Sequence, residues 1–231
     1  MIEIILPSFV VSADAFDDPA DGTLFPEEEA VIGRAVEKRR REFTTARVCA
    51  RKAMKMLGRP PAPVLPGVRG EPQWPDGVVG SMTHCAGYRG AVLGEHTRAT
   101  SIGIDAEPDE PLPYGVLDAI ALPEERDDVR SLLSAHPGVR WDRLLFSAKE
   151  SVYKAWFPLT NQWLSFENAR ITMDPLRGTF SARLLVDGPQ VHGRPLTGFS
   201  GRWLASQGLL LTAIVLPTPV FSTVPAPALP A

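Results

Sequence analysis

The sequence contains little cysteine: only 2 residues, Cys49 and Cys85, in a chain of 231. Two cysteines far apart in the sequence exclude a disulfide-rich scaffold and a cysteine-based zinc cluster. The simplest interpretation is a pair of reduced thiols in a cytoplasmic protein. We expect Cys85 to be a small packing residue, because neither a positioned base nor a second thiol accompanies it.

The sequence also lacks an excess of basic residues and any long apolar run. Lys and Arg number 24 against 27 Asp and Glu, and the net charge is −3. Nucleic-acid-binding domains are normally clearly basic, so we expect no nucleic-acid partner. No stretch approaches the roughly 18 apolar residues of a membrane helix. The start of the chain, residues 1–7, is too short and too acidic for a signal peptide, so we expect no membrane insertion.

Helical and strand patterns are present instead, and together they predict an α+β fold. Apolar, β-prone residues predict a strand at 2–11. Apolar residues at helical spacing predict a long helix from about 26 to 57, with a bend or second start at Thr44-Thr45. Two further helices are expected at 123–134 and 141–156, the second ended by Pro158. The other predicted strands lie at 78–83, 89–95, 101–106, 166–173, 179–186, 199–205 and 209–216.

Each half of the chain carries helices first and antiparallel strands later, which is typical of α+β rather than alternating βαβ architecture. We predict an N-terminal lobe over residues 1–98 and a C-terminal lobe over 99–216. Ligand sites favour such junctions, so we expect the site between the lobes. Residues 217–231 are rich in proline and small residues, and we predict that they form a disordered tail.

Two segments carry the most informative side chains. Asp105 and Glu107 lie two residues apart on a predicted strand and therefore point to the same face. Two adjacent carboxylates repel, so one is protonated unless a cation keeps both ionised. Glu150 and Lys154 share one face of the helix predicted at 141–156. If that face meets the end of the strand, three carboxylates and a lysine converge, a set that suits Mg²⁺ and a phosphate.

Each pair also has an ordinary structural interpretation. Asp105 and Glu107 are compatible with a solvated strand end. Glu150 and Lys154 are compatible with a surface ion pair worth about 0.2–0.5 kcal/mol. The aromatic and apolar neighbours of Glu150 in the sequence argue against a fully exposed helix.

Four motifs, in order, resemble those of the 4′-phosphopantetheinyl transferase superfamily. Gly-Ile-Asp-Ala-Glu (103–107) and Phe-Ser-Ala-Lys-Glu-Ser-Val-Tyr-Lys (146–154) resemble its two signature motifs. Gly-Ser-Met-Thr-His-Cys (80–85) resembles its upstream Ser-x-Ser/Thr-His element, and Arg-Gly-Glu-Pro (69–72) resembles a variant of its Gly-Lys-Pro loop. Their order and spacing resemble the larger class, which activates siderophore, nonribosomal peptide and polyketide synthases. The resemblance covers about residues 30–216 and implies two similar α/β lobes in a pseudo-twofold arrangement, with the site between them.

The resemblance implies a transferase that moves the 4′-phosphopantetheine arm of coenzyme A (CoA) to a serine of an acyl or peptidyl carrier protein. The products are the holo carrier, which serves polyketide, nonribosomal peptide, siderophore or fatty-acid synthesis, and 3′,5′-ADP. It also implies Mg²⁺ as the metal, with Mn²⁺ equally suited to oxygen ligands. A cytoplasmic monomer is the form expected for this class.

The resemblance also implies roles for individual residues. Asp105, Glu107 and Glu150 correspond to the metal ligands, and Glu150, then Glu107, are the candidate general bases. Lys154 corresponds to the lysine near the CoA pyrophosphate, and His84 stabilises the same developing charge. The full set of implied CoA-binding residues is Arg39, Arg47, Arg69, Thr83, His84, Asp105, Glu150 and Lys154.

The family loop often has a lysine ahead of its Gly-x-Pro turn, whereas this chain has Arg69. We expect Arg69 to supply the cation there, with a CoA affinity that is lower or more dependent on Arg47. Lys149 is expected to be a solvated neighbour of the motif or a contact to the carrier. The apolar stretch 112–122 is expected to be either core or an exposed docking patch.

The residues alone leave two other classes of protein open. One is a different Mg²⁺-dependent phosphoester enzyme, such as a phosphatase or nucleotidyltransferase, which needs no carrier protein. The other is a non-catalytic carrier-binding module with a degraded site. The intact set of Asp105, Glu107, Glu150 and Lys154 argues against the second alternative.

Overall fold

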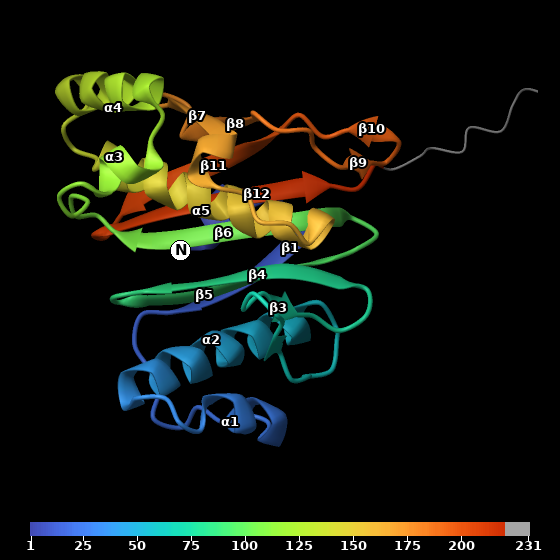
Figure 1. Cartoon of the computed structure of the whole chain (residues 1–231). Coiled ribbons are helices and arrows are strands. Elements are labelled where there is room, and N and C mark those ends of the chain that lie inside the picture. The colour runs from blue at the N-terminus through green and yellow to red at the C-terminus, as the bar shows by residue number, and fades with distance from the viewer. Residues whose placement is uncertain (220–231) are drawn as a thin grey trace, which may run out of the picture.

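The structure is a computed structural model that describes residues 1–219, so residues 220–231 of the predicted tail lie outside the described residues. The fold is α+β, as predicted, and most strands belong to two antiparallel sheets (Figure 1). The first sheet has the order β1 (Val10–Ala15), β5 (Tyr88–Glu95) and β4 (Val78–Cys85). The second sheet has the order β6 (Ala99–Pro108), β12 (Leu209–Pro217), β11 (Gly198–Ser206), β8 (Thr179–Leu184) and β7 (Ala169–Asp174).

Helices cover the two sheets from different sides, as Figure 1 shows. Helix α2 (Glu37–Met56) packs on β5 and β1, and helix α5 (Trp141–Thr160) packs on β6 and β12. The shorter helical elements are η1 (Ile2–Ile5), α1 (Pro26–Ile32), α3 (Val116–Ile120), α4 (Pro123–Ala135) and η2 (Phe166–Asn168). Two short hairpins are formed by β2 (Leu65–Pro66) with β3 (Pro72–Gln73) and by β9 (Gln190–Val191) with β10 (Arg194–Pro195).

The two sheets meet at their edge strands, β4 and β6, and side chains join them. The Ser81 hydroxyl accepts a hydrogen bond from the Ile104 N–H at 3.1 Å, and the Thr83 hydroxyl accepts one from the Ala106 N–H at 3.1 Å. Buried backbone N–H groups need such partners. These two bonds provide partners for backbone N–H groups of β6 without a backbone ladder to β4. They also place Thr83 of β4 next to Asp105 of β6.

Helix α5 lies very close to β6 because β6 carries a glycine at the contact. A Cβ at Gly103 would overlap the Ser151 carbonyl oxygen and lie 2.7 Å from the Ala155 nitrogen. The Ser101 hydroxyl donates to the Ala155 carbonyl at 2.6 Å across the same contact. The chain therefore brings the face of α5 that carries Glu150 and Lys154 directly over the strand that carries Asp105.

Several sequence predictions are wrong at the level of single elements. Residues 2–5 form a 3-10 turn and not the start of a strand, and β1 begins only at Val10, after Pro7. The break in the long N-terminal helix lies at residues 33–36 and not at Thr44-Thr45. Pro158 does not end α5: it lies inside the helix, which continues to Thr160. Its missing N–H removes a single intrahelical hydrogen bond close to the C-terminal end of the helix.

The other differences concern short elements and strand ends. The predicted strand 166–173 begins as the turn η2, and the stretch 112–122 contains helix α3. The predicted disordered tail begins too early, since Pro217 still pairs with Ala99 in the sheet. Between residues 1 and 219, no helix combines the length and the apolar character that crossing a membrane would require.

Candidate functional site

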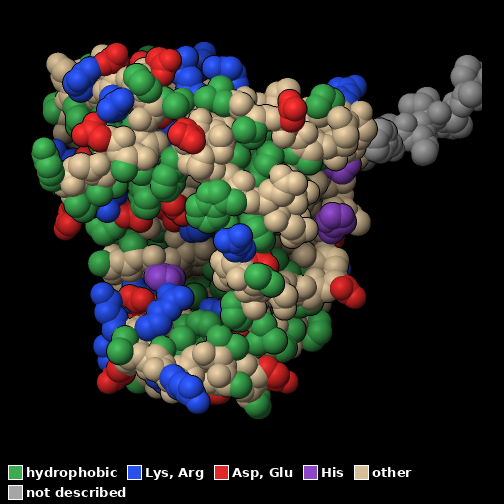
Figure 2. Space-filling view, viewed as in Figure 1, with side chains coloured by type: hydrophobic (Ala, Val, Ile, Leu, Met, Phe, Trp, Pro, Cys, Tyr) green, Lys and Arg blue, Asp and Glu red, His purple; other side chains and the backbone are tan. Residues whose placement is uncertain are grey.

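The predicted site residues gather where the two sheets meet. A pocket of about 330 Å³ is lined by residues from α2, β4, β6 and α5, and Figure 2 shows the hollow between the two halves, with Lys and Arg side chains along its lower edge. Its lining includes Arg39, Arg47, Thr83, His84, Asp105 and Lys154. The structure thus brings together six of the residues that were selected from separate motifs.

The basic wall of this pocket comes from α2 and the end of β4. Arg39 Nη1 lies 2.8 Å from His84 Nε2, and Glu42 Oε2 lies 3.8 Å from His84 Nδ1. Burial, followed by the neighbouring Arg39 charge, lowers the pKa of His84 below its ordinary value, so the ring is neutral at pH 7. Neutral His84 therefore accepts the hydrogen bond from Arg39.

Arg47 forms the inner end of the same wall. Its Nε donates to the Val64 carbonyl at 3.2 Å, and its guanidinium lies 3.1 Å from the centre of the Phe43 ring. Burial lowers the pKa of Arg47 to about 10, which leaves the group charged at neutral pH. A buried cation that faces a pocket and contacts an aromatic ring is well placed to bind an anionic ligand.

Asp105 lies at the centre of the site and is only half satisfied. Its Oδ1 accepts hydrogen bonds from Lys154 at 2.8 Å and from Thr83 at 3.2 Å. Its Oδ2 is buried and has no hydrogen-bond partner among the described residues. A buried carboxylate oxygen without a partner carries a large desolvation cost, so Asp105 Oδ2 has capacity to bind a cation or a hydrogen-bond donor.

Glu107 and Glu150 experience the same negative environment. Burial, followed by the Asp105 charge, raises the pKa of each of these two glutamates above the ordinary value. Glu107 is also paired with Arg143, whose Nη1 lies 3.0 Å from Glu107 Oε2. A divalent cation would stabilise the ionised form of all three carboxylates.

The donor chemistry fits Mg²⁺, but the site is not preassembled. Among residues 1–219, no group of three or more His, Cys, Asp or Glu side chains lies close enough together to hold a metal ion. Asp105 is paired with Lys154, and Glu107 is paired with Arg143. The three-carboxylate ligand set of Asp105, Glu107 and Glu150 therefore stays a prediction.

Two smaller pockets continue from this site along α5. One, of about 200 Å³, is lined by Arg69, Gly70, Glu150, Tyr153 and Lys154 among others, so the arginine that replaces the family lysine does reach the site. The second, of about 140 Å³, is mostly apolar and lies between α5 and the segment 163–169. Glu150 and Tyr153 line both pockets, so the two pockets are adjacent and share these side chains as walls.

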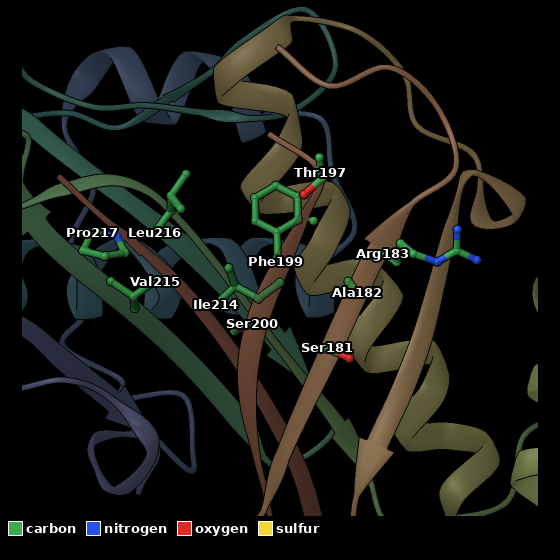
Figure 3. Close-up of a pocket in the computed structure, with 11 residues that line it drawn as sticks. Ser181, Ala182, Arg183, Thr197, Phe199, Ser200, Ile214, Val215, Leu216 and Pro217 are labelled. Atoms are coloured by element: carbon green, nitrogen blue, oxygen red, sulfur yellow. The ribbon is translucent and has the colours of Figure 1, made fainter. Parts of the chain in front are cut away.

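A larger hollow lies elsewhere, between β8, β11 and β12, and Figure 3 shows its lining residues. Its volume is about 480 Å³, yet it contains none of the predicted site residues, and Arg183 is the single ionisable side chain of its lining. One isolated cation provides no means of acid–base or metal chemistry. Size alone therefore does not identify the functional site in this molecule.

The prediction for Lys149 is wrong. Its side chain is 2% exposed and lies 2.9 Å from Glu125 Oε2, and it donates to the carbonyls of Phe166 and Ala169 at 2.7 and 2.9 Å. It is therefore a buried structural cation and not a surface contact. Cys85 is partly buried, and burial raises the pKa of its thiol to about 12, which agrees with the prediction that it is not a nucleophile.

The sequence predictions missed Arg143, although a signal for it is present. Arg143 precedes Glu150 by seven positions and Lys154 by eleven, a spacing that puts all three on one helix face. The apolar stretch 112–122 is partly core and partly exposed surface, since Ile120 is buried whereas Tyr114 is fully exposed.

Comparison with known proteins identifies the family. Residues 27–94 match the model of the 4′-phosphopantetheinyl transferase N-terminal domain, and residues 101–195 match the model of the 4′-phosphopantetheinyl transferase superfamily. The chain is 57% identical over 222 residues to 4′-phosphopantetheinyl transferase Svp of Streptomyces mobaraensis, which covers 95% of this chain and 90% of that protein. It is 53% identical over 224 residues to 4′-phosphopantetheinyl transferase PptT of Mycobacterium tuberculosis, which covers 94% of this chain and 98% of that protein.

A more distant relative matches over a shorter stretch. Enterobactin synthase component D of Salmonella typhimurium is 35% identical over 124 residues, which is 53% of this chain and 50% of that protein.

Proposed function

Because the chain belongs to the 4′-phosphopantetheinyl transferase superfamily, we infer that it transfers the 4′-phosphopantetheine arm of CoA to a serine of acyl or peptidyl carrier proteins. The other product is 3′,5′-ADP. The observation that carries this conclusion is the 57% identity to Svp across 95% of the chain. The gathering of Arg39, His84, Asp105 and Lys154 in one pocket supports it independently.

CoA is proposed to bind across the junction of the two sheets. Arg47 and Arg39 are suited to the ribose 3′-phosphate end, because both are cations on the wall that α2 contributes. Thr83, His84 and Lys154 are proposed to contact the pyrophosphate, with Arg69 at its other side. The apolar pocket between α5 and residues 163–169 suits the pantetheine arm, which carries no charge.

Asp105, Glu107 and Glu150 are proposed to hold Mg²⁺, or Mn²⁺ in its place. The buried Asp105 Oδ2, which has no hydrogen-bond partner within residues 1–219, and the raised pKa values of the two glutamates support this assignment. When bound, the metal supplies charge neutralisation for the oxygens of the pyrophosphate. Lys154 is proposed to leave Asp105 and donate its hydrogen bonds to the pyrophosphate during the reaction.

Glu150 is the first candidate for the general base that removes the proton from the carrier serine, and Glu107 is the second. A raised pKa makes a carboxylate a better proton acceptor near neutral pH. The serine oxygen then bonds to the β-phosphorus of CoA, and the bond from this phosphorus to the bridging oxygen breaks, which releases 3′,5′-ADP. Positioning and charge neutralisation are expected to supply most of the rate enhancement.

We further propose that residues 1–98 and 99–216 act as two lobes, that the enzyme is a monomer, and that it works in the cytoplasm. The positions of the two family matches, 27–94 and 101–195, support this division of the chain. Interfaces between two lobes or domains of one chain are common ligand sites.

The test of the proposed function is the intact mass of an apo carrier protein after incubation with this enzyme, CoA and Mg²⁺. We expect a gain of about 340 Da, the mass of the attached arm, which disappears when EDTA is added. Peptidyl, polyketide and fatty-acid carriers are tested in parallel. If folded enzyme adds no mass to any of them, the function is wrong. Hydrolysis of simple phosphate esters without a carrier would favour another phosphoester enzyme instead.

A further inference from the structure

Arg143 is held in one orientation by three hydrogen bonds. Its Nη1 donates to Glu107 Oε2 at 3.0 Å, its Nε donates to the Glu110 carbonyl at 3.1 Å, and its Nη2 donates to the Pro111 carbonyl at 2.8 Å. A guanidinium presents its donors in a rigid fork, so three simultaneous bonds leave it no freedom to rotate. The positive charge of Arg143 is therefore fixed beside Glu107 and does not swing into solvent.

The pair between Arg143 and Glu107 is shielded from water. The two side chains are 15% and 19% exposed, respectively. Partial burial reduces dielectric and salt screening, so the pair interacts more strongly than an exposed ion pair. Arg143 thus places a fixed positive charge 3.0 Å from Glu107 before any metal ion arrives.

The same arrangement applies to the neighbouring carboxylate. Asp105 is paired with Lys154 at 2.8 Å, so each of these two proposed metal ligands has its own protein cation. Lys154 also donates to the Ile104 carbonyl at 3.0 Å, but its stem is flexible and its side chain is 27% exposed. Arg143 is 15% exposed, and its planar fork is held by the carbonyls of Glu110 and Pro111. Lys154 is therefore the more mobile of the two cations.

We propose that Arg143 is a positioning residue that makes binding of the divalent cation depend on CoA. Without CoA, a cation at Glu107 meets the fixed charge of Arg143, and its affinity is low. With CoA, the pyrophosphate adds negative charge that balances the charges of the divalent cation and Arg143. The repulsion between these two cations then no longer opposes binding of the metal. This inference rests on the proposed function, because it assumes that Glu107 is a metal ligand and that CoA is the substrate.

The test measures binding of Mn²⁺ by the purified full-length enzyme, with free Mn²⁺ determined by electron paramagnetic resonance, in the absence and presence of CoA. Arg143→Met keeps the length of the stem and removes the charge. Without CoA, we expect the dissociation constant for Mn²⁺ to fall about tenfold in this variant, because a like charge is removed from a shielded site. With saturating CoA, we expect wild type and variant to agree within about twofold, so that the coupling between the two ligands is reduced.

The variant is expected to fold, because other bonds still hold the loop that Arg143 contacts. Asp142 Oδ2 accepts a hydrogen bond from the Leu112 N–H at 2.8 Å, and Asp109 Oδ1 accepts one from the Arg140 N–H at 3.2 Å. Arg143→Lys, which keeps the charge but not the fork, is the second variant and should show an intermediate effect. Arg126→Met is the matched control, since it breaks an exposed ion pair with Asp118 on the surface of α4 and should leave Mn²⁺ binding unchanged.

Equal or weaker Mn²⁺ binding by Arg143→Met in the absence of CoA would overturn the inference. If this happens while wild-type enzyme still shows the EDTA-sensitive mass gain on a carrier, the inference fails and the proposed function stands. If the wild type neither binds Mn²⁺ in the presence of CoA nor modifies any carrier, the proposed function itself fails. Thermal unfolding of each variant shows whether the protein that was measured is folded.

Discussion

Helix α5 carries two lysine–carboxylate pairs of nearly equal length in two different surroundings. Lys149 lies 2.9 Å from Glu125, and Lys154 lies 2.8 Å from Asp105. Around Lys149 every polar atom is used: the ammonium also donates to two carbonyls, and Glu125 accepts from the N–H groups of Ile171 and Leu122. Around Lys154 one oxygen of Asp105 has no hydrogen-bond partner among the described residues.

The two pairs show how a structural ion pair can be distinguished from a functional one. The Lys149 pair is 2% and 1% exposed, whereas the Lys154 pair is 27% and 7% exposed and faces a pocket. Distance does not separate the two pairs, but completeness of hydrogen bonding does. A fully satisfied buried pair holds elements together, while an unsatisfied pair at a pocket has capacity left for a ligand.

The strongest loss of activity is expected at the pair of Lys154 and Asp105, which has an oxygen without a partner among the described residues. Asp105→Ala should lower the turnover number for carrier modification by about 10³-fold or more, since charge-stabilising site groups contribute on this scale. The fold should persist, because the substitution removes a carboxylate that repels its two neighbours. Turnover is measured by mass spectrometry and folding by circular dichroism. Near-normal turnover in this variant would contradict the three-carboxylate assignment.

The satisfied pair should respond in the opposite way. Lys149→Met leaves Glu125 buried without its cation, so we expect the free energy of unfolding to fall by about 3–5 kcal/mol. In the double variant Lys149→Met/Glu125→Gln no charge is buried, and most of this loss should be recovered. Urea denaturation measures both. A stable but inactive Lys149→Met enzyme would show instead that Lys149 takes part in the chemistry.

Arg47 tests whether a buried cation away from the reacting atoms acts only through binding. Arg47→Ala should raise KM for CoA about tenfold and change the turnover number much less, because a remote phosphate contact supplies uniform binding energy. Steady-state kinetics with varied CoA measure both constants. The reverse pattern would move Arg47 to the reacting phosphate. Arg41→Ala is a matched control, since Arg41 pairs with Glu37 on the exposed side of α2.

The smallest effect concerns stability against pH in the metal-free enzyme. The pKa of Glu150 is raised in the folded state, so the folded protein binds the proton more readily than the unfolded one, and stability falls as pH rises above about 4.5, the ordinary glutamate value. Glu150→Gln should reduce this slope and stabilise the protein at pH 7 by about 0.5 kcal/mol, while turnover drops. Urea denaturation between pH 4.5 and 8 with EDTA measures the pH dependence of the free energy of unfolding. The same pH dependence in wild type and Glu150→Gln would contradict the raised pKa of Glu150.

The sequence predicted the elements that build the site better than the contacts within it. Strands that contain a short apolar run, such as those at 89–95 and 209–216, and the strongly periodic helix at 141–156 all occur in the structure. Residues 12–15 were not predicted as strand because they contain polar and small residues. In the structure they are extended because all of β1 pairs with β5, and this pairing overrides the local preference. Pro7, which cannot donate to a ladder, lies between the 3-10 turn at 2–5 and the start of β1 at Val10.

For the site, motif spacing was sufficient to select residues that meet in space. Thr83, His84, Asp105 and Lys154 come from three elements and line one pocket. The partner of each charge could not be predicted, because it depends on how the elements pack. Lys149 was assigned to the surface, yet α4 and the 166–169 segment enclose it. Arg143 was missed because its partner Glu107 lies 36 positions away in the sequence.

The absence of a side chain at Gly103 has a consequence for how this enzyme can vary. The separation between α5 and β6 is set by backbone against backbone at that point, so it cannot be adjusted by repacking a rotamer. Even one methyl group would act as a wedge under the helix and lift Glu150 and Lys154 away from Asp105 together. The distance between α5 and β6 at Gly103 thus cannot accommodate even one additional methyl group. Changes that widen the substrate range are therefore expected at the pocket walls, while the spacing between this strand and this helix stays constant.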